Sequence, residues 1–100
     1  MSKQKYRDIM DEDLSLAVFH DGLFLLDKPI KDARKLAGMF KGAANIYKLD
    51  INENKELCRQ LRISTLTYLI YQKGAQIERI EGEVDRVTLQ EKLVNLLHPQ

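Results

Sequence analysis

The stretch 65–82 constrains the fold more than any other part of the chain. The run Thr65–Tyr71 is almost entirely β-branched, aromatic or aliphatic, which is typical of a strand covered on both faces. The run Ala75–Glu81 sets two isoleucines among charged residues, which fits an edge strand with one wet face. Between them, Lys73 and Gly74 form a turn signal, because glycine readily adopts the positive φ of a tight hairpin. The stretch therefore predicts a β-hairpin.

Length and composition limit what can surround this hairpin. The 100 residues fit a single domain, and 44% hydrophobic with 31% charged residues is ordinary for a folded protein. The formal net charge of +1 gives no electrostatic reason to expect a nucleic-acid or membrane partner. No apolar run approaches the roughly 20 residues of a membrane helix. The polar N-terminal residues lack a signal core, and one cysteine suits a reducing compartment, so we expect a cytoplasmic protein.

The rest of the chain reads as helices and strands that feed the hairpin. In order, we expect a short helix within a tail (1–13), a central strand (14–20), a helix that begins near Asp27 or Lys28 and closes at Gly42, a strand (44–51), a short helix capped by Asn52 (53–61), and a last helix capped by Asp85 (86–97). Two βα units followed by a hairpin predict an α/β fold, with a four-stranded mixed sheet and helices on both faces.

Apolar periodicity predicts which side of each element is buried. On the first strand, Leu14, Leu16, Val18 and His20 share one face, and Ala17 and Phe19 share the other. The two long helices should bury Ile30, Ala33, Leu36, Ala37 and Phe40, and Val87, Leu89, Leu93, Leu96 and Leu97, respectively.

This order of elements resembles the thioredoxin superfamily from about Leu14 to Leu97. The resemblance is carried by several short matches at the family's spacing: Val18-Phe19-His20 at the end of a strand, 48–54 as the strand followed by Asp and Asn, 57–63 as a helix ending at an aliphatic residue, 68–74 as the strand before the turn glycine, and then Gly82 and Leu89. The resemblance implies the thioredoxin-like fold.

The family's chemistry is missing from the matching positions. The resemblance implies a Cys-x-x-Cys pair at the start of the first long helix, but the window Gly22–Asp27 reads GLFLLD. The family's buried acid falls on Val18. Its cis-proline falls on Leu66 or on Thr67, depending on the end from which the alignment is counted, and neither is proline. The resemblance therefore implies a redox-inactive member, and we expect no cofactor.

Three side chains remain to be weighed as reactive groups. Cys58, the only thiol, fits a small buried hydrophobe beside Leu57 and Leu61; its alternative role is a redox-active monothiol. His20 lies at the carboxyl end of a strand, where α/β sites gather, but a packed residue is the better expectation. His98 should be solvated. We expect no metal site and no phosphate site, because the chain has neither a Cys/His cluster nor a glycine-rich loop.

An apolar loop stands where the family's reactive loop would be. Leu23, Phe24, Leu25 and Leu26 cannot all turn inward from one short loop, so some of them should be exposed. Together with Leu66 and Thr67, they form a candidate partner-binding loop. We therefore expect a protein-binding or assembly module whose partner is a protein of unknown identity. The alternative is a thiol-based redox protein that uses Cys58 in cell redox homeostasis.

The strand Ala44–Ile51 should have an open outer edge. In larger family members another strand pairs there, but only 13 residues precede Leu14. Such an edge favours a weak homodimer, although Lys48 opposes it unless the register sets Lys48 opposite Asp50 of the second copy. The alternative is a monomer whose edge is covered by the N-terminal segment.

Overall fold

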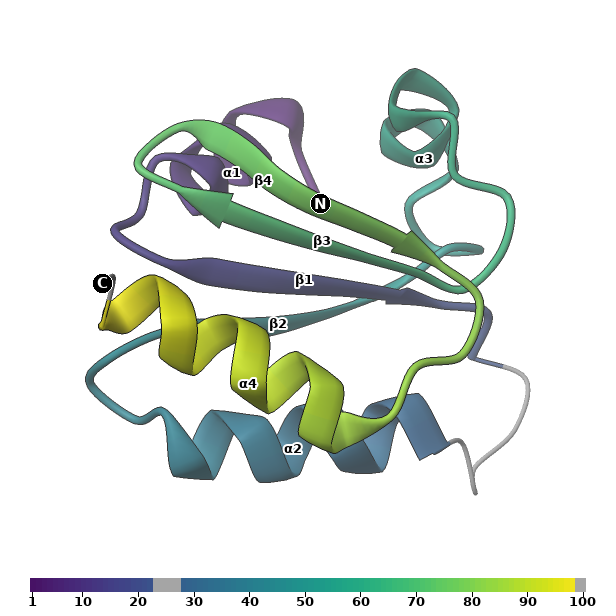
Figure 1. The fold of residues 1–100 in the computed structure, drawn as a ribbon. Helices are drawn as coiled ribbons and strands as arrows, with labels where there is room; N and C mark the ends of the chain where they lie inside the picture. Colours follow the sequence, from purple (N-terminus) through teal and green to yellow (C-terminus); the bar gives the residue numbers. More distant parts are fainter. Residues whose placement is uncertain (23–27, 99–100) are drawn as a thin grey trace.

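The computed structural model of the protein describes residues 1–22 and 28–98. Its elements follow the predicted order (Figure 1). They are α1 (Lys3–Met10), β1 (Ser15–His20), α2 (Lys28–Met39), β2 (Asn45–Asp50), α3 (Lys55–Leu61), β3 (Thr67–Gln72), β4 (Ala75–Glu81) and α4 (Arg86–Leu97).

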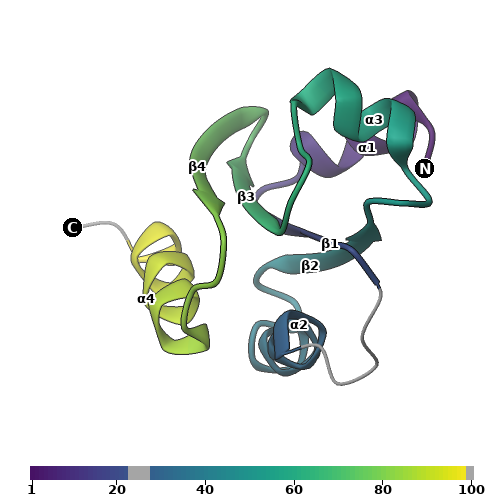
Figure 2. The ribbon, with the colours of Figure 1, turned by 90° about the vertical axis from the view of Figure 1, so that its right-hand side faces the viewer.

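The strands form one mixed sheet in the order β2-β1-β3-β4. β1 is parallel to β2 and antiparallel to β3, and β3 pairs antiparallel with β4. Figure 2 shows α2 and α4 on one side of this sheet and α1 and α3 on the other. The predicted fold class, with helices on both faces, is confirmed.

The face under α2 and α4 carries the larger apolar core. Leu16, Val18 and Ile70 of the two central strands are completely buried there against Leu36 of α2 and Leu93 of α4. Because side chains alternate along a strand, the neighbouring residues serve the other face. The sharing of faces predicted for the first strand is therefore confirmed.

The face under α1 and α3 carries a second core with more polar atoms. Phe19 and Leu69 of the central strands pack there against Tyr6 of α1 and against Leu57 and Cys58 of α3. The polar atoms of this face find partners inside the core. The Tyr6 and Tyr71 hydroxyls lie 2.8 Å apart, and the Ser15 hydroxyl donates to the Ile9 carbonyl at 2.9 Å.

The hairpin has the predicted turn. Lys73 and Gly74 both have positive φ, 52° and 88° respectively. Two consecutive residues with positive φ match the right-handed twist of the flanking strands, and glycine adopts such a φ without steric cost. β4 is an edge strand with mostly exposed or half-buried residues, as predicted.

The predicted start of the short helix is wrong. α3 begins at Lys55 after an N-terminal cap at Asn54, rather than at Glu53 after Asn52. Asn52 belongs to the turn that follows β2: its N–H donates to Asp50 Oδ1 at 2.8 Å, and its side-chain amide donates to the Asp21 carbonyl at 2.8 Å. The Asn52 side chain, which the local sequence predicted as a helix cap, thus binds a carbonyl that is distant in sequence.

Two predicted core positions are also wrong. Ala37 of α2 is exposed, and Val87 of α4 is 52% exposed. In α4, Leu89 and Leu93 face the sheet, and Val87 lies two residues before Leu89, which turns it to the opposite side of the helix. In addition, α2 ends at Met39, so Gly42 lies in the following turn with φ +83° rather than directly at the helix end.

Candidate functional site at the ends of β1 and β3

His20 lies at the carboxyl end of β1, and its side chain is on the side of the sheet that α2 and α4 cover. The residue is 9% exposed, and its Nδ1 is buried without a hydrogen-bond partner. His20 is in register with Asp50 of β2, so the two side chains leave the sheet on the same face. This is the end of the parallel strands at which α/β proteins place their sites.

Leu66 and Thr67 lie at the start of β3, next to the end of β1. Thr67 pairs with Phe19, which places Leu66 next to the His20 end of the strand. Leu66 is half-buried and packs against the core under α2 and α4, and its carbonyl accepts from the Gly82 N–H at 2.8 Å. Thr67 is 1% exposed, so its side chain is buried in this structure, and its place in a binding surface stays a prediction.

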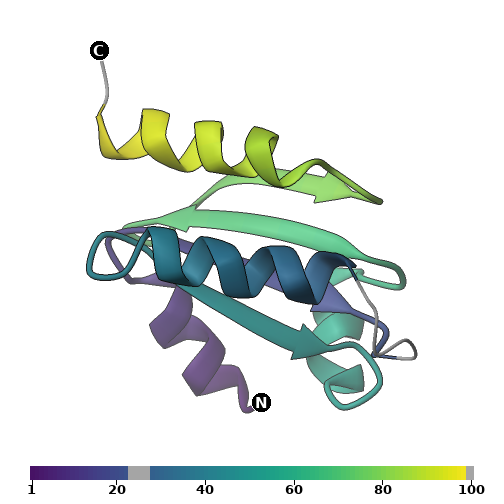
Figure 3. The same ribbon diagram turned by 90° about the horizontal axis from the view of Figure 1, so that it is seen from below.

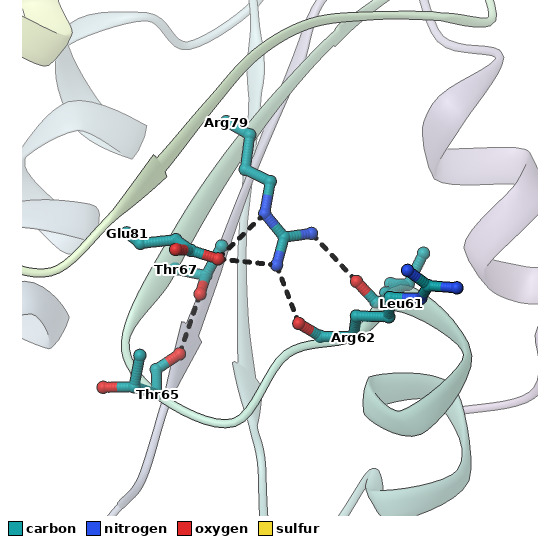
Figure 4. Close-up of polar contacts among 6 residues, drawn as sticks. All are labelled: Leu61, Arg62, Thr65, Thr67, Arg79 and Glu81. Atoms are coloured by element: carbon teal, nitrogen blue, oxygen red, sulfur yellow. Dashed lines mark hydrogen bonds and ion pairs between the residues drawn. The ribbon is translucent and has the colours of Figure 1, made fainter.

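The loop that leads into β3 is held by Arg79 of β4 (Figure 4). The Arg79 guanidinium donates to the carbonyls of Leu61 and Arg62 at 2.8 Å each, and it also pairs with Glu81 at 2.9 Å. These carbonyls end α3, where a cation is favourable because the helix dipole is negative there. Arg79 therefore fixes the position of the segment between α3 and β3.

Within that segment, a short side-chain contact holds the first turn before the strand. The Thr67 hydroxyl donates to the Thr65 carbonyl at 2.8 Å (Figure 4). Among the residues that the structure describes, there is no cis peptide bond, so Leu66 and Thr67 both follow trans bonds.

A second polar network joins the turn after β1 to the turn after β2. Gly22 has φ +70°, and a Cβ there would fall 2.2 Å from Asp50 Oδ2. Only glycine therefore fits without a shift of the aspartate. Asn52 adds the bond to the Asp21 carbonyl described above. This network holds the start of the loop that follows β1. Neither Arg79 nor Asp50 was predicted as part of this site. Arg79 reaches carbonyls 17 and 18 positions earlier, and Asp50 lies against Gly22, which is distant in sequence, so neither contact leaves a local signal.

The predicted binding loop itself lies outside the described residues. Leu23, Phe24, Leu25 and Leu26, with the possible helix cap Asp27, belong to the stretch 23–27 that the structure does not describe. What is described is the frame around this stretch: Gly22 before it in the chain, Lys28 of α2 after it, and Leu66 beside the end of β1.

Cys58 is not part of this site. It is 2% exposed and lies in α3, in the core under α1 and α3, whereas the site lies on the α2 side of the sheet. Burial raises the pKa of the Cys58 thiol, and the negative charge of Asp50 raises it further. A raised pKa disfavours the thiolate, which is the nucleophilic form. The predicted buried position is confirmed. His98, at the end of α4, is exposed as predicted.

Two searches of the described residues are relevant to function. Within 1–22 and 28–98, no three His, Cys, Asp or Glu side chains come together as metal ligands. Over the same ranges, no helix has both the length and the apolar composition that crossing a membrane requires.

Comparison with known proteins gives a match in structure and none in sequence. No protein-family model and no curated protein sequence matches this chain. A mutant thioredoxin from Halobacterium salinarum superposes with a TM-score of 0.83 at 20% identity, over 100% of this chain and 89% of that one. Thioredoxin from Trypanosoma brucei brucei superposes with a TM-score of 0.80 at 26% identity, over 96% of this chain and 86% of that one. The chain is a thioredoxin-fold protein without the Cys-x-x-Cys pair.

Mitochondrial thioredoxin 3 from Saccharomyces cerevisiae is similar as well, with a TM-score of 0.74 at 17% identity over 92% of this chain and 88% of that one. In this thioredoxin-fold protein, the position between β1 and α2 holds an apolar stretch, and the single thiol lies on the far side of the sheet. The fold is retained, and the Cys-x-x-Cys pair is not.

Proposed function

We propose that this protein is a redox-inactive thioredoxin-fold module that binds a protein partner in the cytoplasm. The observation that carries the proposal is the position of Cys58: the only thiol is 2% exposed and lies on the face opposite the start of α2. Disulfide exchange needs a thiolate that can reach the disulfide sulfur in line, and a buried thiol with a raised pKa meets neither requirement.

Binding is proposed at the frame around 23–27. Leu66 is half-buried beside the end of β1, and the four apolar residues of the loop follow Gly22 in sequence. An apolar loop on a rigid scaffold is a common way to present a binding surface. Arg79 holds the segment that carries Leu66, and the Asp50–Asn52 turn holds Asp21 and Gly22, from which the loop starts.

The first experiment tests the chemistry. Insulin reduction driven by dithiothreitol should proceed no faster with the protein than with dithiothreitol alone, and native Cys58 should react with a thiol reagent far more slowly than free cysteine. Turnover above the blank, together with fast labelling of Cys58, would instead establish the monothiol redox protein as the function.

The second experiment tests the loop. Proteins that co-purify with the wild type should be lost with Phe24→Ser/Leu25→Ser and retained with Val94→Ser, which changes an exposed apolar residue on α4. Equal recovery with both variants would place the binding surface elsewhere.

A further inference from the structure

The outer edge of β2 carries backbone groups that no described strand pairs. The Asn45 N–H donates to the Leu14 carbonyl at 3.0 Å, and the Ile51 N–H donates to the His20 carbonyl at 2.7 Å. Odd-numbered residues of β2 therefore direct their backbone groups toward β1. Because these groups alternate along a strand, the N–H and C=O groups of Ile46 and Lys48 point away from the sheet.

One side of this edge is strongly basic. Residues 28–48 hold six of the sixteen basic residues of the chain and one of its fifteen acidic residues. That acid, Asp32, is paired with Lys28 at 2.8 Å. The other five basic residues are exposed, and none forms an ion pair with another described residue: Lys31, Arg34, Lys35, Lys41 and Lys48.

Three of these side chains, Lys31, Arg34 and Lys35, belong to α2; Lys41 lies in the turn that follows it, and Lys48 lies in β2. Figure 3 shows α2 covering one face of the sheet, close to β2. Ala37 and Lys41 line an open groove of 230 Å³ with Ile46. Arg34 shares the helix face of Ala37, since it lies three residues before it, and Lys41 follows two residues after the helix ends at Met39. Lys48 lies two residues beyond Ile46 and leaves β2 on the same face.

The other side of the edge is different in character. An open groove of 430 Å³ lies there, and its lining combines Met1, Ile9 and Tyr47 with the charged residues Lys5, Asp8 and Glu12. The Tyr47 hydroxyl donates to the Glu12 carboxylate at 2.6 Å, so this acid is already engaged. A segment lying along β2 would thus meet unpaired cations on one side, and on the other a groove in which Met1, Ile9 and Tyr47 offer apolar contacts among charges of both signs.

We infer that this edge binds an extended acidic segment of a partner protein as a fifth strand. Acidic side chains of that segment lie on the α2 side, near Arg34, Lys41 and Lys48, and apolar ones alternate with them on the side of Tyr47. Strand addition of this kind draws affinity from main-chain hydrogen bonds and specificity from alternate side chains. None of the residues named for this surface belongs to 23–27, and the inference goes beyond the proposed function.

Two features weigh against a second copy of the chain as the occupant. In a two-fold antiparallel pair of edges, both α2 helices lie on the same face of the joined sheet, so their basic residues would face each other. The register that sets Lys48 opposite Asp50 also needs the Asp50 carbonyl. That carbonyl already accepts from the Glu53 N–H at 3.2 Å and from the Asn54 side chain at 2.8 Å. The homodimer stays a prediction that the same experiments decide.

The binding test uses a short fluorescent peptide of alternating glutamate and valine. Its binding is measured by fluorescence anisotropy at low salt. We expect saturable binding that weakens as salt is added, and binding weaker by about tenfold for a peptide with lysine in place of glutamate. No binding of the glutamate peptide, or equal binding of the two peptides, would overturn the inference.

Protein variants locate the site. Arg34→Glu/Lys41→Glu/Lys48→Glu should lower affinity for the glutamate peptide by about tenfold or more. The matched control changes three exposed lysines elsewhere, so its net charge is the same: Lys3→Glu/Lys55→Glu/Lys73→Glu. We expect the change in log Kd of the control variant to be less than about half of the change for the site variant. Equal losses would show a response to net charge alone and would contradict this site. Circular dichroism melting confirms that both variants are folded.

Backbone methylation tests the strand pairing itself. In an antiparallel ladder, the glutamates opposite Ile46 and Lys48 direct their own N–H groups at the edge, so N-methylation of the glutamates should abolish binding and N-methylation of the valines should not. The reverse pattern would indicate a parallel strand and would also support the edge. Equal binding of both methylated peptides would overturn it.

Light scattering across protein concentrations tests the competing occupant. We expect a monomer at every concentration used for peptide binding. A dimer that Ile46→Pro dissociates and that the peptide cannot displace would assign the edge to a second copy and overturn the inference. None of these outcomes bears on insulin reduction or on Phe24, so failure here is distinguishable from failure of the proposed function.

Discussion

The two faces of the sheet are built differently. The face under α2 and α4 is filled by aliphatic and aromatic carbon, with the Tyr68 phenol and His20 among few polar groups. The face under α1 and α3 buries two tyrosine hydroxyls, a serine hydroxyl and the only thiol. In thioredoxins, by the resemblance noted above, reactive groups gather at the start of the long helix, which here is α2. In this chain the start of α2 has no thiol, and the thiol of Cys58 is buried on the other side of the sheet.

The difference teaches that retained fold and retained chemistry rest on different residues. The carbon-rich face needs only volume and shape, which many aliphatic residues satisfy. The polar face needs each buried group to have a specific partner, because an unsatisfied buried polar group is costly. The first face should therefore respond to lost volume and the second to lost hydrogen bonds and to pH.

The largest expected effect comes from lost volume on the face under α2 and α4. Leu36→Ala, at a completely buried position, should lower the free energy of unfolding by about 3 kcal/mol, measured by urea titration. Val87→Ala, at the exposed side of α4, serves as the control and should change it by less than about 0.5 kcal/mol. Similar small losses for both would contradict a tightly packed core on this face.

Next in size is the alkaline pH dependence of the polar face. Burial raises the pKa of Tyr6, and the hydrogen bond to Tyr71 adds to the rise; burial likewise raises the pKa of Tyr71. The unfolded chain then loses these protons first, so stability is constant below about pH 10 and falls as pH rises further, by about 1.4 kcal/mol per pH unit for each such phenol. Urea titrations between pH 9 and pH 11, roughly, measure this fall.

A matched variant sharpens that test. Tyr6→Phe removes one of the phenols, so the fall above about pH 10 should become shallower. Tyr47, whose pKa is raised to about 12 by burial and by the hydrogen bond to Glu12, sits at the β2 edge and provides the comparison. Unchanged slopes in Tyr6→Phe would mean that this phenol ionises equally easily in the folded protein.

The third effect is the coupling between Tyr6 and Tyr71. Either Tyr6→Phe or Tyr71→Phe leaves one buried hydroxyl without its partner and should cost about 1.5 kcal/mol. The double variant should cost no more than one single variant, since no hydroxyl is then left behind. Strictly additive losses in urea titration would show that the 2.8 Å contact contributes nothing specific.

The smallest effect concerns Cys58. Cys58→Ala should lower stability by about 1 kcal/mol, at the low end of losses on shrinking a buried side chain. Partner binding should be unaffected once the variant is measured well below its melting temperature. Lost binding with an unchanged melting temperature would point to a working thiol and would break the contrast between the two faces.

Local sequence was enough to predict much of this architecture. The hairpin, the order of the elements and the alternating faces of β1 follow from turn residues and from apolar periods of 2 and 3.6, which neighbours in sequence determine. The absence of the Cys-x-x-Cys pair was equally readable, because it depends only on which residues stand at 22–27.

Other features were decided by contacts between distant segments. Asn52 is a turn residue rather than a helix cap because the Asp21 carbonyl, 31 positions earlier, is folded against it. The segment before β3 is placed by Arg79, which reaches back to the last carbonyls of α3. No local pattern encodes either contact.

What the sequence by itself determined is the set of elements and the absence of a reactive cysteine pair, since both are properties of residue identity and short spacing. What only the tertiary structure decided is where the remaining groups meet. Cys58 faces away from the α2 end because α3 packs on the opposite side of the sheet. The basic residues of 28–48 already cluster in the sequence, but only the fold puts Lys41 in a groove with Ile46 at the outer edge of β2, because the chain returns from α2 into the strand that the helix covers.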